Sequence, residues 1–384
     1  MSRLPERAAD TVTPSSVRAK REGPVRRILI YRLGSLGDTV VALPVLRLVA
    51  RAFPDAERHL LTNFSAHAKA APMAAVLAHT DLIHGVLEYP IGVRNPVRLW
   101  ALWRQIRDLR PEVLVYLAEP RGRLRAWRDA LFFRACGIRH LIGVPYTHDQ
   151  QHVRRLADGS FEYEGTRLAR CIGELGDAQL DDPASFDLAL TTEEQSAASA
   201  VLVSLGDGRP LLAASIGAKM DVKDWGDTNW GALLAALSRA LPDWGLVMLG
   251  SADEEVRTAR LLARWVGPSL NLCGRIHVRE AAAVLVRCQV FIGHDSGPMH
   301  LAAAVGTPCV AMFSSRNQPG EWFPHGRRHR VLYQPMPCQG CGLDVCVERQ
   351  KACIRSITIE ASFAAVMHLA TRADSAPTQM EVTS

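Results

Sequence analysis

Residues 27–38 read Arg27-Ile-Leu-Ile-Tyr-Arg-Leu-Gly-Ser-Leu-Gly-Asp38, and this stretch decides the fold that the sequence predicts. A short apolar run leads into a turn with two glycines, and a helical pattern of apolar residues then continues to about Phe53. The next apolar run, His59–Thr62, predicts a second strand. The order strand, glycine turn, helix, strand is typical of the start of a doubly wound parallel sheet.

The same alternation continues along the 384 residues and restarts once. In the first half we expect further strands at 82–87, 113–117, 140–144 and 186–190, and helices at 98–109 and 167–175. A helix and linker at 191–209 follow. In the second half we expect strands at 210–216, 245–249, 290–293 and 309–313, and helices at 230–241, 254–266, 280–287 and 299–305. Two such units predict an α/β protein with two Rossmann-like, doubly wound domains facing a cleft.

The predicted domain boundaries follow from this restart. Residues 1–26 are rich in Arg, Pro, Ser and Thr and predict a flexible basic tail. Residues 27–205 form the predicted first domain and residues 206–370 the second. Residues 371–384 are expected to form another flexible tail.

Composition excludes several classes of protein. Apolar residues make up 48% and charged residues 22%, which is typical of a globular protein. The chain has neither an apolar run of ~20 residues nor a secretory signal at its start, so the sequence predicts a cytoplasmic protein. Its net charge of +6 includes arginine clusters at 121–128 and 327–330, which fit either a solvated surface or a phosphate-bearing partner. No recognition motif indicates binding of nucleic acid.

The glycine turn supplies the first candidate site. Gly34 and Gly37 allow the backbone to turn sharply and to approach a ligand closely. Asp38 lies at the start of the following helix, where an ionised carboxylate can act as a general base. The alternative is that Asp38 only caps the helix. The turn lacks the third glycine of a dinucleotide fingerprint, which argues against NAD binding.

The second candidate site is the start of the helix after strand 290–293. The sequence there is Asp295-Ser296-Gly297-Pro298, followed by His300 in the first helical turn. Free backbone N–H groups and the helix dipole favour a phosphate at such a position. Developing charge on a departing diphosphate would be stabilised there. The alternative is a capped helix with a histidine in the core.

Two further residues follow strands of the second half at their carboxyl ends. Lys223 is placed to reach a phosphate, and Glu254 to hold ribose hydroxyls. The alternatives are a lysine that faces solvent and a glutamate that only stabilises the first turn of its helix.

Four of the nine cysteines lie close together near the end of the chain: Cys338, Cys341, Cys346 and Cys353. The spacing of the first two is that of a metal knuckle, and the other two could complete a set of four thiolates for structural zinc or iron. The alternative is a packed loop with reduced thiols.

Both glycine-containing motifs are similar to those of glycosyltransferase family 9, the lipopolysaccharide heptosyltransferases. The resemblance runs from about Arg27 to about His368. It is carried by the opening motif, which continues to Pro44, and by Asp295-Ser-Gly-Pro-Met-His-Leu-Ala-Ala-Ala304 followed by Gly306-Thr-Pro308. The resemblance implies the GT-B fold, inversion at the anomeric carbon, ADP-heptose as donor and no metal in the chemistry.

The resemblance also implies a role for each candidate residue. Asp38 corresponds to the catalytic base, Lys223 to a ligand of the donor phosphate, and Glu254 to the ribose ligand, although Glu255 lies beside it. Ser296, Gly297 and His300 correspond to the diphosphate cradle. Ile276 corresponds to the side chain that packs against adenine. Gly226 departs from the family, which usually has proline there. Many members carry a cysteine-rich segment where Cys338–Cys353 lie, and in one protein-modifying subgroup that segment holds iron.

The resulting prediction is an inverting transfer of a sugar to a lipid-linked oligosaccharide acceptor, at or near the inner-membrane surface. The rival interpretations are a nicotinamide or flavin oxidoreductase, a non-catalytic nucleotide-sugar-binding protein, and a metal-binding regulator built on the cysteines.

Overall fold

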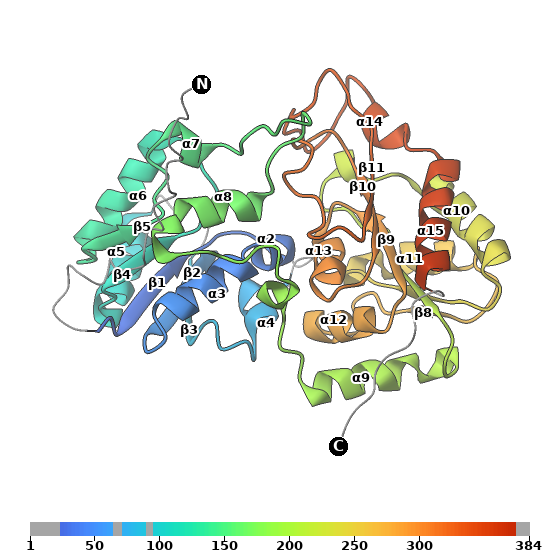
Figure 1. Ribbon diagram of the computed structural model, residues 1–384, viewed down its shortest axis with the longest axis horizontal. Coiled ribbons are helices and arrows are strands. Elements are labelled where there is room, and N and C mark those ends of the chain that lie inside the picture. Colours follow the sequence, from blue (N-terminus) through green and yellow to red (C-terminus); the bar gives the residue numbers. More distant parts are fainter. Residues whose placement is uncertain (1–23, 64–70, 90–94, 374–384) are drawn as a thin grey trace, which may run out of the picture.

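The computed structural model describes residues 24–63, 71–89 and 95–373 and contains two parallel sheets, each flanked by helices (Figure 1). Most of both predicted tails therefore lies outside the described residues. Among the described helices, none is both long and apolar enough to cross a membrane. The predicted α/β class with two parallel sheets is confirmed.

The first sheet has five described strands in the order β3-β2-β1-β4-β5. Its elements are β1 (Arg27–Tyr31), α2 (Leu36–Val41), α3 (Leu43–Ala52), β2 (Glu57–Asn63), α4 (Met73–Leu77), β3 (Gly85–Tyr89), α5 (Pro96–Leu109), β4 (Val113–Tyr116), α6 (Arg123–Ala135), β5 (His140–Ile142), α7 (His148–Gln151) and α8 (Glu164–Cys171). The pairing partners of the central strand lie on both sides of it, since β1 pairs in parallel with β2 and with β4. The strand order reverses beside β1, so the loop after β1 lies at a crevice suited to a ligand.

The connecting segment contains η1 (Gly173–Leu175), η2 (Pro183–Phe186), α9 (Thr192–Leu202) and η3 (Val203–Leu205). The prediction of a strand at 186–190 is wrong. The guanidinium of Arg279, which is distant in sequence, donates hydrogen bonds to the carbonyl oxygens of Leu188 and Ala189, both at 2.9 Å. Ala189 also has φ of +48°, which is incompatible with a regular strand.

The second sheet has six described strands in the order β11-β10-β9-β6-β7-β8. Its elements are β6 (Leu211–Ser215), η4 (Asp221–Lys223), α10 (Asp227–Ala240), β7 (Gly245–Met248), η5 (Ala252–Glu254), α11 (Glu255–Leu262), β8 (Ser269–Asn271), α12 (Val278–Val286), β9 (Val290–His294), α13 (Gly297–Ala304), β10 (Cys309–Phe313), β11 (Arg330–Tyr333), α14 (Ala352–Arg355) and α15 (Ile359–Ala373). Strands β8 and β11 and helices α4, α6, α7, α14 and α15 were not expected from the sequence. Helix α15 continues to Ala373, into the residues expected to begin the second tail.

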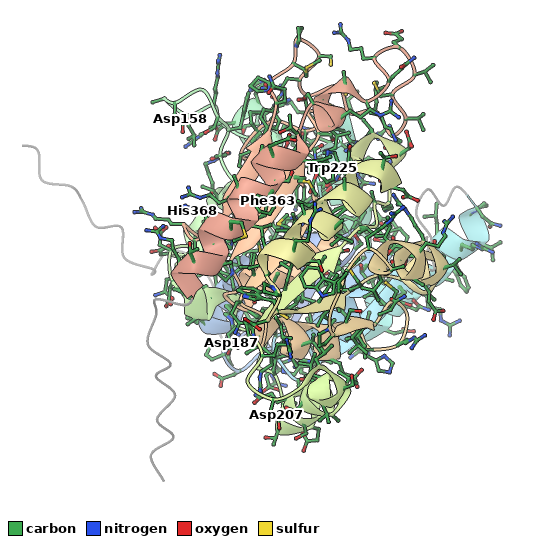
Figure 2. The ribbon with its side chains drawn as sticks, turned by 90° about the vertical axis from the view of Figure 1, so that its right-hand side faces the viewer. Asp158, Asp187, Asp207, Trp225, Phe363 and His368 are labelled. Atoms are coloured by element: carbon green, nitrogen blue, oxygen red, sulfur yellow. The ribbon has the colours of Figure 1, made fainter. Side chains whose placement is uncertain are left out.

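Helix α15 packs across the second sheet beside α10, as seen in Figure 2, where Phe363 and Trp225 are labelled. The indole N–H of Trp225 donates to the carbonyl oxygen of Ile357 at 2.8 Å, just before α15 begins. This contact anchors the loop that follows β6, because Trp225 is fully buried beside Trp230.

The two sheets share one apolar cluster. It includes Ile28 and Leu46 from the first unit and Ala213, Phe291 and Val284 from the second, all fully buried. The buried Arg279 adds a polar connection, since it also donates to the carbonyl oxygen of Val76 and pairs with Glu194. This shared packing holds the carboxyl ends of the two sheets around one cleft.

Candidate active site

A cleft of about 980 Å³ lies between the two units. It is lined by all ten residues that the sequence motifs predicted for the base, the glycine turn and the donor site: Gly34, Gly37, Asp38, Lys223, Glu254, Ile276, Asp295, Ser296, Gly297 and His300. The four cysteines lie elsewhere.

Asp38 is held rigidly at the start of α2. The helix has Ser35 as its N-cap, so Asp38 is the third residue of a capping box and not the N-cap itself. Its Oδ2 accepts the backbone N–H of Ser35 at 2.7 Å, and its Oδ1 lies 3.8 Å from the guanidinium of Arg32. Arg32 is fully buried, whereas the Asp38 side chain is 19% exposed to the cleft. Asp38 therefore caps the helix and faces a ligand at once.

The glycines of both motifs permit close contacts. Gly34 has φ of +135°, and a Cβ there would lie 2.3 Å from Cγ of Asp38. A Cβ on Gly37 would lie 2.9 Å from Cδ2 of His300, and one on Gly297 would lie 2.7 Å from Cδ2 of Leu36. Real Cβ atoms do not approach this closely. The starts of α2 and α13 therefore contact each other where both line the cleft, and a side chain at Gly37 or Gly297 would clash there.

The start of α13 lacks a side-chain cap. Its N-cap is Ser296, whose hydroxyl donates back to the carbonyl oxygen of His294 at 3.3 Å and does not bond to the helix. Pro298 contributes no N–H, and Met299 at the third helical position has no carboxylate with which to complete a capping box. The positive end of this helix thus lines the cleft without a side-chain cap on its N–H groups.

His300, in the first turn of α13, is buried beside Trp322. Burial lowers the pKa of His300, although the nearby Asp295 and Asp38 carboxylates act in the opposite direction. The imidazole is therefore neutral at neutral pH and is suited to a hydrogen bond.

Lys223 is held in place by a carboxylate. Its Nζ lies 2.6 Å from Oδ2 of Asp295 and donates to the Asp295 carbonyl oxygen at 3.2 Å. Asp295 is itself buried, which makes it a positioning partner for the lysine and poorly suited to contact an anion directly. The loop of Lys223 is fixed further by His294, whose Nε2 accepts the backbone N–H of Trp225 at 3.2 Å. Burial lowers the pKa of His294 to about 4, so its neutral ring keeps this acceptor.

Glu254 lies in a space that two glycines leave open. A Cβ on Gly217 would lie 1.8 Å from its Oε1, and a Cβ on Gly250 would lie 2.4 Å from its Oε2. Oε2 also accepts the backbone N–H of Ser251 at 2.9 Å. The neighbouring Glu255 pairs with Arg275 at 2.6 Å outside the cleft. Glu254, and not Glu255, is therefore the cleft carboxylate, and Ile276 lines the same part of the cleft.

Five charged residues on the first-unit side of the cleft were not predicted as site residues: Glu119, Arg121, Glu164, Arg167 and Glu321. Burial raises the pKa of Glu321 to about 7, with Glu164 and Glu119 acting in the same direction. Desolvation by the walls of the cleft raises the pKa of Glu119, and the negative charge of Asp38 acts in the same direction. The Glu119 side chain nevertheless stays accessible to solvent within the cleft. The position of Glu119 after β4 was the one available sequence signal, because carboxyl ends of parallel strands carry ligand sites.

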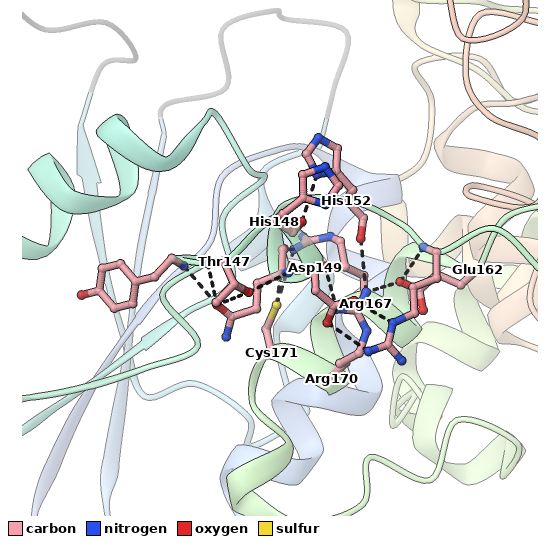
Figure 3. Close-up of polar contacts among 11 residues, drawn as sticks. Thr147, His148, Asp149, His152, Glu162, Arg167, Arg170 and Cys171 are labelled. Atoms are coloured by element: carbon pink, nitrogen blue, oxygen red, sulfur yellow. Dashed lines mark hydrogen bonds and ion pairs between the residues drawn. The ribbon is translucent and has the colours of Figure 1, made fainter.

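Arg167 and Glu164 form a buried bidentate pair, with both N–O distances at 2.6 Å. Figure 3 shows the polar network behind this pair, in which Arg170 contacts both Asp149 and Glu162. Arg167 also donates to the carbonyl oxygen of Gln150 at 3.0 Å. The network joins α7 to α8 and so fixes the wall of the cleft on the acceptor side of the predicted reaction.

The four cysteines line a separate cavity of about 460 Å³. Cys353 is buried and Cys341 is exposed. Within the part of the chain that the structure describes, no group of three or more His, Cys, Asp or Glu side chains is arranged to hold a metal ion. Four thiols around one cavity remain a chemically suitable donor set for zinc or iron. The cysteine segment contacts the loop that carries Lys223, since the backbone N–H of Val222 donates to the carbonyl oxygen of Asp344 at 3.0 Å.

The chain is similar to known proteins over most of its length. The sequence model described as "Glycosyltransferase family 9 (heptosyltransferase)" matches residues 125–352, which is more than half of the chain. Lipopolysaccharide heptosyltransferase 1 of Pseudomonas aeruginosa is 26% identical over 340 residues, covering 83% of this chain and 87% of that protein.

Solved structures show the same fold. A glycosyl transferase family 9 structure from Veillonella parvula has a TM-score of 0.68 at 17% identity and covers 92% of this chain and 99% of that one. The ADP-heptose LPS heptosyltransferase II of Escherichia coli has a TM-score of 0.63 at 20% identity and covers 91% and 99%. The predicted GT-B architecture is thereby confirmed. On the family match and the shared fold, the chain belongs to glycosyltransferase family 9, the heptosyltransferase family.

Proposed function

We propose that the protein transfers heptose from ADP-heptose to a hydroxyl group of a lipopolysaccharide core or related glycan, with inversion at the anomeric carbon. One observation carries the proposal: the carboxylate of Asp38 and the uncapped start of α13 line the same cleft, and the two helices that bear them touch at Gly37 and His300. The proposed base and the proposed diphosphate cradle thus line one cleft.

The donor half of the proposal rests on the second unit. The start of α13 and the ammonium of Lys223 offer positive charge to a diphosphate. The carboxylate of Glu254 offers acceptors for ribose hydroxyls, and Ile276 offers an apolar surface for adenine. Relatives with solved structures are described as binding ADP and ADP-2-deoxy-2-fluoro heptose, which supports an adenine nucleotide as the donor.

The proposed reaction is a single displacement. Asp38 accepts the proton of the acceptor hydroxyl while that oxygen forms a bond to the anomeric carbon. The bond from the anomeric carbon to the diphosphate oxygen breaks, and the diphosphate leaves with the electron pair. Lys223 and the helix start stabilise its charge, and neutral His300 donates a hydrogen bond.

We further propose that no metal takes part in this step, since the cleft supplies its own positive charge. Four cysteines would hold any zinc or iron in the separate cavity, as a structural ion. Treatment with EDTA is expected to leave the transfer rate unchanged, and metal analysis of protein purified without a His-tag checks whether the cysteine cavity is loaded. A loss of transfer that returns on addition of a divalent metal would contradict metal independence.

The acceptor is proposed to be lipid-linked, which places the enzyme at the cytoplasmic surface of the inner membrane. Membership in a glycosyltransferase family argues against an oxidoreductase. A non-catalytic sugar-nucleotide binder would bind ADP but release none from ADP-heptose.

The first experiment is thermal unfolding with ADP, UDP, GDP, CMP and NAD, because a ligand that binds only the folded state raises the midpoint. We expect a shift with ADP and then release of ADP from ADP-heptose only in the presence of acceptor. A shift with UDP or GDP alone would exclude heptose from ADP-heptose, and a shift with NAD alone would overturn the proposal.

A further inference from the structure

The outer surface of α6 exposes large apolar side chains in a row. Leu124 is 87% exposed, Trp127 59% and Leu131 70%. Their spacing of three and four residues places them on one side of the helix, opposite Ala126 and Ala130, which are buried against the sheet. An apolar row of this kind on an outer helix face marks an interaction surface.

Helix α5 extends this surface. Helices α5 and α6 pack on the same side of the first sheet, within one apolar cluster, and lie together at one end of the molecule in Figure 1. They are joined by a hydrogen bond from the indole N–H of Trp103 to the carbonyl oxygen of Ala135 at 3.0 Å. Trp100 on α5 is 55% exposed and lies beneath the guanidinium of Arg104. We call the outer side of these two helices the α5–α6 face.

The charge of the α5–α6 face has one dominant sign. The two helices contain seven arginines against two aspartates. One of these aspartates, Asp129, is buried and paired with Arg121 and Arg128, so it contributes little negative charge to the surface. Arg123, Arg125 and Arg134 are exposed on α6. A row of Trp and Leu side chains bordered by arginines is typical of helices that lie on an anionic lipid surface.

The face adjoins the acceptor side of the cleft. Glu119 and Arg121 line the cleft, and α6 begins two residues after Arg121, with Leu124 in its first turn. A protein lying on a bilayer by this face would hold the rim of its cleft close to the headgroups. We therefore propose that the α5–α6 face docks on an anionic lipid bilayer and presents the cleft to a membrane-anchored acceptor. This inference rests on the proposed function for the nature of the acceptor.

The positive charge of the α5–α6 face favours an anionic bilayer over a second copy of this chain as the partner. Two copies of this chain joined through the same face would bring two arginine-rich surfaces together, which is repulsive even though Arg104 and Arg128 are paired with aspartates of their own helices. An anionic bilayer offers neutralising charge and an apolar layer for Leu124, Trp127 and Leu131. The long arginine side chains can reach headgroup phosphates while their stems lie beside the apolar row.

The test measures sedimentation of the full-length protein with vesicles, without substrates. Vesicles contain phosphatidylglycerol mixed with phosphatidylethanolamine, or phosphatidylcholine alone. One variant replaces the apolar row: Leu124→Ser, Trp127→Ser and Leu131→Ser. A second removes charge: Arg123→Gln, Arg125→Gln and Arg134→Gln. Matched controls change exposed residues of the second unit: Val256→Ser with Val266→Ser, and Arg239→Gln with Arg260→Gln and Arg287→Gln.

We expect the wild type and both controls to sediment with the anionic vesicles and to remain free with phosphatidylcholine. The row and charge variants should bind at least roughly tenfold more weakly. Equal binding by the row variant and the wild type, or no binding by the wild type, would overturn the proposal. If the wild type ignores vesicles but the row variant alone changes a dimer to a monomer in analytical ultracentrifugation, a second copy covers the face.

A separate readout distinguishes failure of docking from failure of the proposed function. All variants should keep the ADP-dependent rise in unfolding midpoint and the kcat/KM for a detergent-dispersed acceptor, since none of the substituted residues lines the cleft. The row variant should show a raised KM only for acceptor in vesicles. Normal vesicle binding without any ADP response would leave docking intact and overturn the donor assignment.

Discussion

Helices α2 and α13 both begin at the cleft with a serine N-cap and a glycine in the first turn, but they differ at the third helical position. Each has a serine N-cap with extended backbone, followed by glycine in the first turn. In α2 the third residue is Asp38, whose carboxylate bonds to its own N-cap, whereas in α13 the third residue is Met299. The first helix thus supplies its own anion, and the second leaves its positive end for a ligand.

This difference separates two chemical tasks. An anion held by the protein is fixed in position and can serve as a base in every turnover. An uncapped start gains its anion only when a ligand arrives, so it can distinguish the bound from the free state. The first three of the following four predictions test whether the two starts act in this way, and the fourth tests the charge of the cleft wall.

The largest effect is expected at the start of α2, which Asp38 caps. Asp38→Asn keeps an oxygen that can accept the N–H of Ser35, so the fold should survive, but an amide cannot take up a proton. We expect transfer to fall by roughly 10²–10⁴-fold with ADP affinity unchanged. Initial rates of ADP release measure this, with the exposed Asp207→Asn as the matched control. Full activity of Asp38→Asn would remove the assigned base.

A smaller effect, on the affinity for ADP, is expected beside the uncapped start of α13. Lys223→Ala removes the charge that we propose binds the diphosphate and leaves the buried Asp295 carboxylate without its 2.6 Å partner. ADP should bind roughly 10–100-fold more weakly, as expected for loss of a charge-assisted contact. Titration calorimetry measures the affinity. Two further variants are compared with Lys223→Ala: Asp295→Asn in that background, which removes the unpaired carboxylate, and Lys223→Arg, which keeps the positive charge. If neither binds ADP more tightly than Lys223→Ala, the lysine does not act as a point charge on phosphate.

The contact between the starts can be opened by one methyl group. In Gly37→Ala, the new Cβ would lie 2.9 Å from His300, so the two helices must separate slightly. We expect kcat to fall roughly tenfold while ADP affinity changes little, because the reacting groups no longer align. Gly173→Ala is the control, since a Cβ there meets no atom within 4 Å. Equal kcat in Gly37→Ala and the wild type would show that the contact does not align the reaction.

The smallest effect concerns pH. Burial raises the folded-state pKa of Glu321 to about 7, so folding favours its protonated form. The associated stability is fully present below about pH 4.5 and is lost as pH rises to about 7. Relative to Glu321→Gln, the wild type should therefore lose about 1–2 kcal/mol of unfolding free energy across this range, after allowance for solvent screening. Chemical denaturation at several pH values checks this, and parallel curves for both proteins would contradict the raised pKa.

The sequence predicted the parts of the site that are local. The strand, the glycine turn and the helix start stand within a dozen residues of one another, so pattern and spacing were sufficient to place Asp38 and the start of α13. The structure brings these predicted residues into one cleft. Their assigned roles stay predictions, and so do the domain boundaries and the metal.

Long-range contacts explain what the sequence left out. Glu321 reaches the first-unit side of the cleft because the backbone N–H of Glu164 donates to the Glu321 carbonyl oxygen, a pairing across 157 positions that no local pattern carries. The expected strand at 186–190 failed for the same reason, because Arg279 occupies the carbonyl groups that a neighbouring strand would use. Strand β8 has only three residues, too few for a periodic signal.

Arg279 has a consequence for attempts to exchange parts between relatives. Its guanidinium takes acceptors from Val76, Leu188, Ala189 and Glu194, all of which precede the second sheet. A chimera joined at residue 205 would seat this buried cation among foreign carbonyl groups, and a charge left there without acceptors is costly. The two halves are therefore not interchangeable modules, and a working graft of the donor half must carry the backbone that receives Arg279.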